Sequence, residues 1–514
     1  MPNFASQLAA ERPAEAALTD PSRTLGWAEV GDTLNRVANA LREMDLGPDR
    51  RVAVFAENAA ETALAHLGGL LAGASTVPVN FHLTADEAAY VLRDSATRVL
   101  FVGPETSARG AQAARAAGVD LIVGWHLADD EAEGGKAWTD WLAAADPDDP
   151  PLDVAPRPNL LYTSGTTGLP KGTELPPTMF AGGGTMDEHL AALRTNAFAR
   201  FGTHLVVGPM YHTGPLSGMR LLVAGVPSVI LGRFDAERTL QTIERYSTES
   251  AVMVPTHFVR LLALPDHVRA HYDVSSMQFV AHTGASCPVD VKRAMIDWWG
   301  PIFMDAYGAS EVGTTCSITS EEWLSHPGSV GRSIPPFEAM ILGDDDAEVP
   351  QGTEGRLYFR DITGRGVVYP NDPAKSAAAH IAPGVFTLGE IGVIDGEGYV
   401  YITDRFSDLV VSGGTNIYPA EAEQVLLGHP GVADAACIGV PHHEMGEELR
   451  GLVIAADVSD PPDPVELVAW CRERLTHYKC PRTIELVDDL GRNTMGKISK
   501  RTLRAPYWEG APKT

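Results

Sequence analysis

The sequence predicts an α/β protein with a large N-terminal region of βαβ units, a β-rich stretch after it, and a small α+β unit at the end. Over the first 300 residues, short runs rich in β-branched residues alternate with stretches that are apolar at helical spacing. After about Ile341 the pattern becomes β-rich. Strands that alternate with helices favour parallel sheets covered by helices. A chain of 514 residues is long enough for roughly two to four domains.

The strands and helices of the first 300 residues follow from periodicity. Apolar side chains at Val30, Leu34, Val37 and Leu41 recur at helical spacing, and residues 85–93 form a second helix-like stretch. A Pro- and Asp-rich segment, residues 145–158, is expected to be an exposed connector. The expected strands are residues 51–55, 98–102, 119–123, 204–207, 227–231, 251–254 and 278–281.

The last hundred residues predict a separate small α+β unit. Its pattern gives helices over residues 420–427 and 464–475. Strands are expected over residues 433–440, 451–455 and 483–487.

Composition limits the classes of function. The 40 Lys and Arg residues against 67 Asp and Glu residues give a net charge of −27, which disfavours a nucleic-acid partner. Five scattered cysteines with no C-x-x-C pair favour a reducing compartment and no structural zinc site. The most apolar stretch, residues 63–79, is too short and too interrupted for a membrane span, and the first residues carry no secretory signal pattern. We therefore expect a cytoplasmic enzyme with no integral membrane segment.

The strongest local motif is the loop that follows an apolar run at residues 160–163. Glycines allow backbone N–H groups to approach an anion, hydroxyl groups add donors, and a lysine adds positive charge. Pro170 precedes the lysine, so the motif is not a Walker A loop. The candidate phosphate-binding residues are Thr163, Ser164, Gly165, Thr166, Thr167, Gly168 and Lys171.

This loop resembles the phosphate-binding loop of the adenylate-forming superfamily, which includes acyl-CoA synthetases, peptide-synthetase adenylation domains and firefly luciferase. Further motifs resemble those of the family in the same order along the chain. The resemblance implies that Gly284, Ala285 and Ser286 line the adenine. It also implies that His212, in Pro-Met-Tyr-His-Thr-Gly, borders the acyl pocket.

The run from Asp305 to Glu311 resembles the family's Y-G-x-T-E motif, with Ser310 in the position of the threonine. An aromatic face at Tyr307, beside Gly308, can pack on adenine. The Ser310 hydroxyl can bond the α-phosphate, and the Glu311 carboxylate can hold Mg²⁺. Taken without its neighbours, the same run also fits a helix start capped at Ser310.

Two departures from the family's pattern lie downstream. Glu390 stands where the family has an aspartate that binds both ribose hydroxyls, and the resemblance gives Arg405 a ribose contact. Ser407 stands at the hinge position, where the family usually has Lys or Asp. A hinge needs only to absorb backbone rotation, so serine is compatible with that role.

The last two motifs resemble the family's thiol-binding tunnel and its adenylation lysine. Gly413 and Gly414 match glycines beside the family's pantetheine tunnel. Lys497, in Asn-Thr-Met-Gly-Lys, matches the lysine that stabilises charge as pyrophosphate leaves.

The resemblance therefore implies an acyl-CoA synthetase that uses ATP, Mg²⁺ and coenzyme A. It would activate a fatty, aryl or steroid-like acid as an acyl-adenylate. The implied domains are residues 1–405, which bind AMP and the acyl group, and residues 406–514, a small mobile lid. A homodimer is compatible with the family. A carrier-protein acceptor and a non-catalytic nucleotide sensor remain alternatives. The acyl pocket is expected near residues 178–184 and 254–258, where three glycines, residues 182–184, remove bulk.

Overall fold

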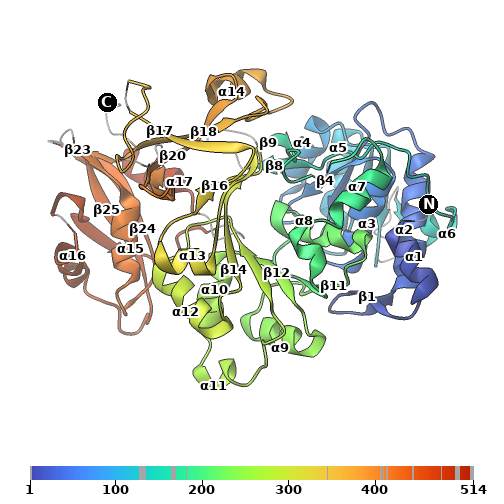
Figure 1. The fold of residues 1–514 in the computed structure, drawn as a ribbon, viewed down its shortest axis with the longest axis horizontal. Coiled ribbons are helices and arrows are strands. Elements are labelled where there is room, and N and C mark those ends of the chain that lie inside the picture. The colour runs from blue at the N-terminus through green and yellow to red at the C-terminus, as the bar shows by residue number, and fades with distance from the viewer. Residues whose placement is uncertain are drawn as a thin grey trace. The chain divides into compact units, whose positions relative to one another are not determined.

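The chain, described by a computed structural model, divides into two compact units. The first unit comprises residues 1–283, 291–314 and 367–378, and the second comprises 284–290, 315–366 and 379–514 (Figure 1). The division into 1–405 and 406–514 expected above stays a prediction. The structure describes residues 3–126, 135–163, 170–180, 182–343, 345–405, 408, 410–412, 415–442, 445–475, 477–492 and 498–509.

The first unit contains a five-stranded, all-parallel sheet in the order β4-β3-β5-β6-β7. Helices α2 and α3 are connected through β3 and pack against each other, and α4 packs against α5. The bounds are α2 (Trp27–Arg42), β3 (Arg51–Phe55), α3 (Ala60–Leu71), β4 (Ser75–Val79), α4 (Ala85–Asp94), β5 (Val99–Val102), α5 (Ser107–Ala117), β6 (Leu121–Gly124), β7 (Lys136–Ala137) and α6 (Trp138–Ala143).

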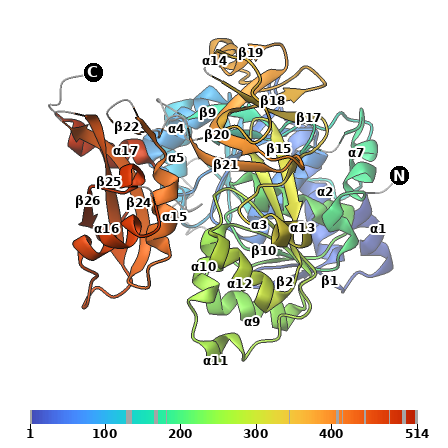
Figure 2. The same cartoon turned by 60° about the vertical axis from the view of Figure 1, so that its left-hand side comes forward.

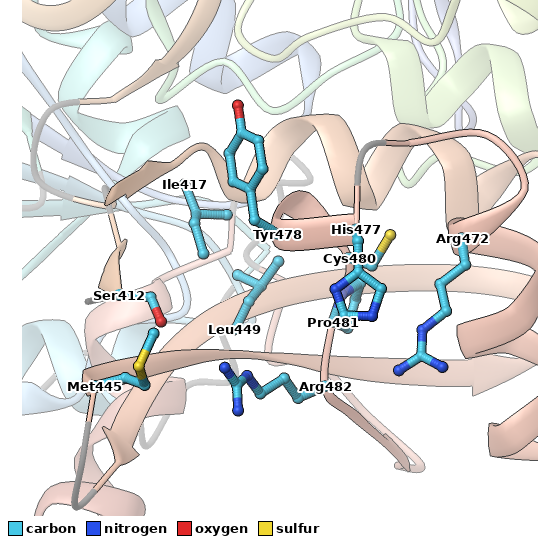
Figure 3. A pocket seen from close by; sticks show the side chains of 10 residues that line it. All are labelled: Ser412, Ile417, Met445, Leu449, Arg472, His477, Tyr478, Cys480, Pro481 and Arg482. Atoms are coloured by element: carbon cyan, nitrogen blue, oxygen red, sulfur yellow. The ribbon is translucent and has the colours of Figure 1, made fainter. Parts of the chain in front are cut away.

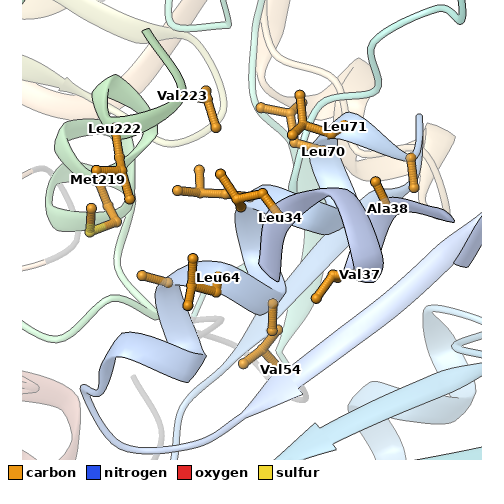
Figure 4. Close-up of a cluster of buried hydrophobic side chains, with 14 of the residues drawn as sticks. Leu34, Val37, Ala38, Val54, Leu64, Leu70, Leu71, Met219, Leu222 and Val223 are labelled. Carbon is orange, nitrogen blue, oxygen red and sulfur yellow. The ribbon is translucent and has the colours of Figure 1, made fainter. Parts of the chain in front are cut away.

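Strands β3, β4 and β5 of this sheet are buried at every position, and their residues are mostly apolar, with Arg51, Ser75 and Thr76 as the polar exceptions. Val52 and Val54 of β3 belong to a core that also contains residues of α2 and α3. Figure 4 shows Val54 in this core together with Val37 of α2 and Leu64 of α3. Ala53 and Phe55, at the alternate positions, join the core formed with α4 and α5. A near-continuous apolar strand is the pattern expected of a parallel sheet covered by helices on both sides. The layered βαβ arrangement predicted from the sequence is confirmed.

A second sheet of the first unit runs in the order β14-β13-β12-β10-β11-β1-β2, with only β2 antiparallel among the pairs of this run. Leu18, Val206 and Ile230 of this sheet belong to the same core as Val52 and Val54 of the first sheet. The bounds are α1 (Phe4–Glu11), β1 (Ala16–Thr19), β2 (Thr24–Gly26), β10 (His204–Val206), β11 (Ser228–Ile230), β12 (Ser250–Met253), β13 (Phe279–His282) and β14 (Phe303–Ala309).

The remaining elements of this part of the chain cover the sheets or carry site residues. Segment 144–159 contains no helix or strand, as expected for a connector. The bounds are β8 (Leu160–Thr163), β9 (Lys171–Glu174), α7 (Met186–Leu193), η1 (Ala197–Arg200), α8 (Thr213–Met219), η2 (Arg220–Ala224), α9 (Ala236–Tyr246), α10 (Pro255–Leu262), α11 (Asp266–Arg269), α12 (Val289–Trp299) and α14 (Pro373–Ala378).

The second unit begins with antiparallel structure, which confirms the β-rich stretch expected after Ile341. Its sheet has the order β17-β18-β20-β19, and β21 pairs with β20. The bounds are β15 (Gly313–Thr319), α13 (Ser320–Ser325), β16 (Arg332–Ser333), β17 (Phe337–Leu342), β18 (Gly355–Asp361), β19 (His380–Ala382), β20 (Val385–Ile394) and β21 (Val400–Arg405).

The C-terminal part of the second unit is a small α+β fold, as predicted (Figure 2). Its sheet has the order β23-β22-β25-β24, with β26 parallel to β25. Leu426 of α15 and Leu467 of α16 pack in one core, while α17 contributes Leu503 to another. The bounds are β22 (Val410–Ser412), β23 (Thr415–Ile417), α15 (Pro419–Leu427), β24 (Val432–His442), β25 (Gly446–Ala455), α16 (Pro464–Arg472), η4 (His477–Lys479), β26 (Thr483–Leu486) and α17 (Lys500–Trp508).

One local alternative is wrong. The helix start at Ser310 does not occur, because Asp305 to Ala309 lie in β14 and residues 310–312 form the turn into β15. None of the helices in the described ranges is long and apolar enough to cross a membrane.

Candidate active site

The predicted phosphate loop connects two short paired strands of the first unit. β8 and β9 are antiparallel, and Thr163 stands opposite Lys171 at the end of the pair. Tyr162 donates a hydrogen bond to Asp94 Oδ2 at 2.7 Å, and Tyr90 donates to the carbonyl of Pro170 at 3.0 Å. These bonds tie both ends of the loop to α4. Ser164, Gly165, Thr166, Thr167 and Gly168 lie outside the described residues.

Lys171 is held in a network of charged side chains. Its ammonium group donates to the carboxylate of Asp372, whose other oxygen accepts from the backbone N–H of Lys375 at 3.0 Å. The hydrogen bond from Lys171 is the largest cause of a lowered pKa at Asp372. Burial, followed by the charge of Lys171, lowers the pKa of Lys375. Two ammonium groups and a carboxylate therefore share one region of the first unit.

Glu311 lies at the turn after β14 and belongs to the same region. Tyr369 donates a hydrogen bond to Glu311 Oε1 at 3.1 Å, and the Lys375 ammonium lies 4.2 Å from the centre of the Tyr369 ring. Burial, followed by the negative charge of Glu311, raises the pKa of Tyr369. Tyr369 therefore lies between the carboxylate of Glu311 and the ammonium group of Lys375.

The motif that contains His212 meets the motif that contains Glu311. His212 stands at the N-cap position of α8. The Oγ1 of its neighbour Thr213 lies 3.3 Å from the Oγ of Ser310. Tyr211 packs its ring against His212 at 4.2 Å and edge-on against Phe81 at 5.5 Å. The structure thus brings together two predicted motifs that are about a hundred residues apart.

Gly308 and Gly313 are required by the tight turn that carries Ser310 and Glu311. A Cβ on Gly308 would lie 1.9 Å from the carbonyl oxygen of Gly313. Gly313 has a φ of +85°, in the left-handed region that favours glycine. Gly308 is thus a structural requirement of the turn, and the half-buried Tyr307 stands beside it in β14.

Asp305 is paired with buried groups of its own unit. Lys292 Nζ, on a side chain that is only 1% exposed, lies 3.2 Å from Asp305 Oδ2. His282 Nε2 lies 3.6 Å from the same oxygen, and burial lowers the pKa of His282 to about 4. The imidazole is therefore neutral near pH 7, and Lys292 supplies the charge that balances Asp305.

The remaining described candidates belong to the second unit. Gly284, with a φ of +89°, Ala285 and the exposed Ser286 form the turn between β13 and α12. Glu390 of β20 pairs in register with Arg405 of β21, and Glu390 is 7% exposed. The two residues predicted to contact the ribose are therefore neighbours on adjacent strands.

Besides the five loop residues named above, four more predicted functional residues lie outside the described residues: Ser407, Gly413, Gly414 and Lys497. A metal site built from three or more His, Cys, Asp or Glu side chains does not occur within the described part of the chain. Glu311 is the carboxylate that the sequence motif assigns to the metal ion. A carboxylate suits Mg²⁺, which is usually bound by one or two carboxylates together with substrate phosphates.

Sequence reasoning missed Tyr369, Asp372 and Lys375. All three lie in segment 367–378, which the fold returns to the first unit although its neighbours in sequence belong to the second. No motif in this segment marks it as functional. Only its proximity to Lys171 and Glu311 does so.

One residue of the glycine run 182–184 has a backbone requirement of its own, and the expectation that the run makes room for the acyl group stays a prediction. Gly183 has a φ of +126°, and a Cβ there would lie 2.7 Å from the backbone nitrogen of His189. Gly183 is thus required by the turn into α7. A Cβ on Gly182 would meet nothing within 4 Å, so Gly182 is the position where bulk can be added.

A pocket of about 150 Å³ lies in the C-terminal part of the second unit (Figure 3). Two arginines and a histidine contribute positive or protonatable groups to its wall, beside the ring of Tyr478. Arginine suits phosphate because its planar group can donate two parallel hydrogen bonds. The pocket is lined by Ser412, Ile417, Met445, Leu449, Arg472, His477, Tyr478, Cys480, Pro481 and Arg482.

Comparison with protein families identifies the class of protein. Residues 5–367 match the AMP-binding enzyme family, and residues 421–497 match the AMP-binding enzyme C-terminal domain. The chain belongs to the AMP-binding enzyme family. The resemblance inferred from the motifs is confirmed.

Several curated relatives span almost the whole chain. One, from Rhodococcus jostii, is a propanoyl:CoA ligase whose acyl group carries a 7a-methyl-1,5-dioxo-octahydro-1H-inden-4-yl ring system; it is 32% identical, covering 95% of each chain. A fatty acid–acyl-carrier-protein ligase from Streptomyces coeruleorubidus is 30% identical over 97% of this chain and 95% of its own. A feruloyl-CoA synthase from Amycolatopsis is 32% identical over 96% of each.

Solved structures agree on the fold. The ATP-bound structure of MatB from Rhodopseudomonas palustris is 27% identical and covers 99% of each chain, with a TM-score of 0.81. The mixed α/β fold with a larger N-terminal and a smaller C-terminal part is therefore that of an AMP-binding enzyme.

Proposed function

We propose that this chain is an acyl-CoA ligase, which activates a carboxylic acid with ATP and then transfers the acyl group to the thiol of coenzyme A. The observation that carries the proposal is the meeting of three motifs in the first unit. Lys171, Glu311 with Ser310, and the His212 motif lie in one region around Tyr369. Membership in the AMP-binding enzyme family supports the same reaction class.

In the first half-reaction, the substrate carboxylate attacks the α-phosphorus of ATP and pyrophosphate leaves. Lys171 and Lys375 supply positive charge to the polyphosphate, since an ATP phosphate can replace Asp372 as the partner of Lys171. The Ser310 hydroxyl bonds the α-phosphate. Glu311 would hold Mg²⁺, which supplies charge neutralisation to the phosphates when bound. Positioning and charge stabilisation account for most of the catalysis.

The second unit carries the residues that we propose to bind the ribose. Glu390 accepts hydrogen bonds from the ribose hydroxyls, with Arg405 beside it on the neighbouring strand. Lys497 stabilises the departing charge, and the C-terminal lid rotates about Ser407 to present Gly413 and Gly414 to the thiol.

The acceptor is coenzyme A in this proposal. The Arg472 and Arg482 side chains at the C-terminal pocket fit an acceptor that carries phosphate groups. A carrier protein also presents a phosphate-linked thiol, and one relative is a ligase for an acyl-carrier protein. The test below separates the two acceptors.

The acyl substrate is a carboxylic acid that has no amino group and carries a large apolar part. The named activities of relatives cover a fatty acid, a feruloyl group and a bicyclic propanoyl group. These names support the fatty, aryl or steroid-like range expected from the sequence. A cytoplasmic location, supported by the scattered cysteines, and a homodimeric state belong to the same proposal.

Carboxylate-dependent exchange of pyrophosphate into ATP tests the first half-reaction. A panel of long-chain, cinnamic and polycyclic acids is used with wild type and with Lys497→Ala. The control variant is Lys500→Ala, since Lys500 pairs with Glu423 at 2.9 Å in the same part of the chain. Exchange that Lys497→Ala abolishes and Lys500→Ala retains supports the proposal. If ATP binds but no acid of the panel supports pyrophosphate exchange, the proposal is contradicted and a nucleotide sensor is favoured.

Product analysis tests the second half-reaction. Coenzyme A and a phosphopantetheinylated carrier protein are supplied separately with the best acid. Thioester formation on coenzyme A alone supports the ligase. Thioester formation on the carrier protein alone would overturn the assignment of the acceptor while leaving the adenylation step in place.

A further inference from the structure

A second cavity, of about 720 Å³, lies in the first unit among α2, α3, α6 and the edge strand β7. Its volume is in the range of small-molecule sites, roughly 300–1,000 Å³. None of its lining residues belongs to the adenylation site described above. The wall consists of Arg23, Leu25, Glu29, Asp32, Thr33, Glu61, Leu64, Gly124, Trp125, His126, Ala137, Trp138, Thr139, Asp140 and Leu142.

Glu61 places a buried carboxylate at this wall. The residue is 2% exposed and stands in the first turn of α3. Its Oε1 accepts from the guanidinium of Arg23 and lies 3.2 Å from His126 Nε2. Its Oε2 is buried and has no hydrogen-bond partner among the described residues. A buried carboxylate oxygen without a donor is costly, so this atom is suited to accept a bond from a ligand.

Trp125 contributes a second unsatisfied polar atom. The residue is 2% exposed, and its indole Nε1 likewise finds no acceptor within the ranges that the structure describes. The Trp125 ring packs edge-on against Trp138, with 5.7 Å between the ring centres, and Trp138 packs against Phe101 at 6.0 Å. The aromatic side of the cavity is therefore fixed by packing.

The charged residues that line the cavity favour a positively charged ligand. Four carboxylates line the cavity against one arginine and one histidine. An anion would be repelled, whereas a cation is attracted both by the carboxylates and by the faces of tryptophan rings. The four carboxylates are those of Glu29, Asp32, Glu61 and Asp140.

We propose that this cavity is a binding site for a small organic ammonium ion with an aromatic or aliphatic body. The ammonium group donates to Glu61 Oε2, and the body packs on Trp125, Trp138 and Leu64. This site goes beyond the ligase reaction, because neither the acid, nor ATP, nor coenzyme A carries this combination of a primary ammonium and an apolar body.

The test is a calorimetric titration of the full-length protein with 2-phenylethylammonium. The uncharged isostere 2-phenylethanol is titrated in parallel. We expect saturable binding of one ammonium ion per chain and weaker binding of the alcohol. Glu61→Gln keeps the shape and removes the charge, so it should weaken binding by about 10- to 100-fold, the loss typical of a hydrogen bond to a charged group.

A second variant with its control keeps the proposal testable if Glu61→Gln does not fold. Asp140 is exposed at the cavity wall, so Asp140→Lys reverses a charge without disturbing the core and should weaken binding at least several-fold. The matched control is Glu237→Gln, which removes a first-turn carboxylate of α9 outside the cavity and should leave binding unchanged. Absence of saturable binding, equal affinity for the alcohol, or no effect of Asp140→Lys would overturn the proposal.

Discussion

The hydrogen bond from Tyr369 to Glu311 gives the sharpest prediction about the proposed nucleotide site. Tyr369→Phe deletes only the hydroxyl and keeps the ring beneath Lys375. A hydrogen bond to a charged group contributes about 1.5–3 kcal/mol. The O–O distance of 3.1 Å is longer than the 2.5–2.7 Å of the strongest such bonds, which favours the low end, about 1.5 kcal/mol. That energy corresponds to about a tenfold effect.

The assay is pyrophosphate exchange measured against the concentration of Mg²⁺ at saturating acid. Without its partner, the Glu311 carboxylate is less well positioned, so half-saturation should require about tenfold more Mg²⁺. Tyr272→Phe is the matched control, because Tyr272 donates an equivalent bond to Glu237 at 2.9 Å away from the site. An unchanged Mg²⁺ dependence in Tyr369→Phe, or an equal shift in the control, would refute the reasoning.

Three further predictions concern packing, a buried charge pair and pH. Gly308→Ala should lower both exchange activity and the thermal midpoint, because its methyl group would meet the Gly313 carbonyl at 1.9 Å, whereas Gly396→Ala has open space and should change neither. Lys292→Met leaves the Asp305 carboxylate without its buried cation and should destabilise the first unit by about 3 kcal/mol, measured by thermal unfolding; no loss would show that the pair is not formed. Stability should also fall as pH drops from about 6.5 toward 4, because buried neutral histidines bind protons only after unfolding, and each contributes about 1.4 kcal/mol per pH unit in that window. Burial lowers the pKa of these histidines to about 3 or 4. His66→Gln should therefore reduce the slope of the thermal midpoint against pH, and an identical slope would contradict this assignment. The four residues are His66, His204, His257 and His282.

Regular elements were predicted well where the apolar pattern was unambiguous. Strand β3 has the predicted bounds, and α4 extends the prediction by one residue. In contrast, β25 begins at Gly446, five residues before the predicted strand. This early part of the strand is rich in charged residues, so pairing with β24 decides its conformation rather than local propensity.

The run from Asp305 to Glu311 shows the limit of local reasoning. Its sequence fits either a capped helix or a strand and turn. The strand forms because residues 303–305 pair with β13 in the middle of a buried sheet. A local cap cannot compete with burial and ladder hydrogen bonds on that scale.

The sequence by itself determined the enzyme family. Its motifs consist of glycines that let the backbone approach an anion, hydroxyl groups and charged side chains, and each motif is a local feature that can be recognised along the chain. The sequence also placed Lys171, Ser310, Glu311 and His212, whose motifs do lie together in the first unit. The geometry among distant segments could not be read from it.

Only the tertiary structure decided which charges surround the proposed phosphate site. Lys171 and Asp372 are 201 residues apart, and Tyr369 is 58 residues from Glu311. It also showed that Gly183 serves its own backbone and that Glu61 and Trp125 face one cavity. These relations depend on how strands and connections pack in three dimensions, because contact between such separated residues leaves no periodic signal in a single sequence.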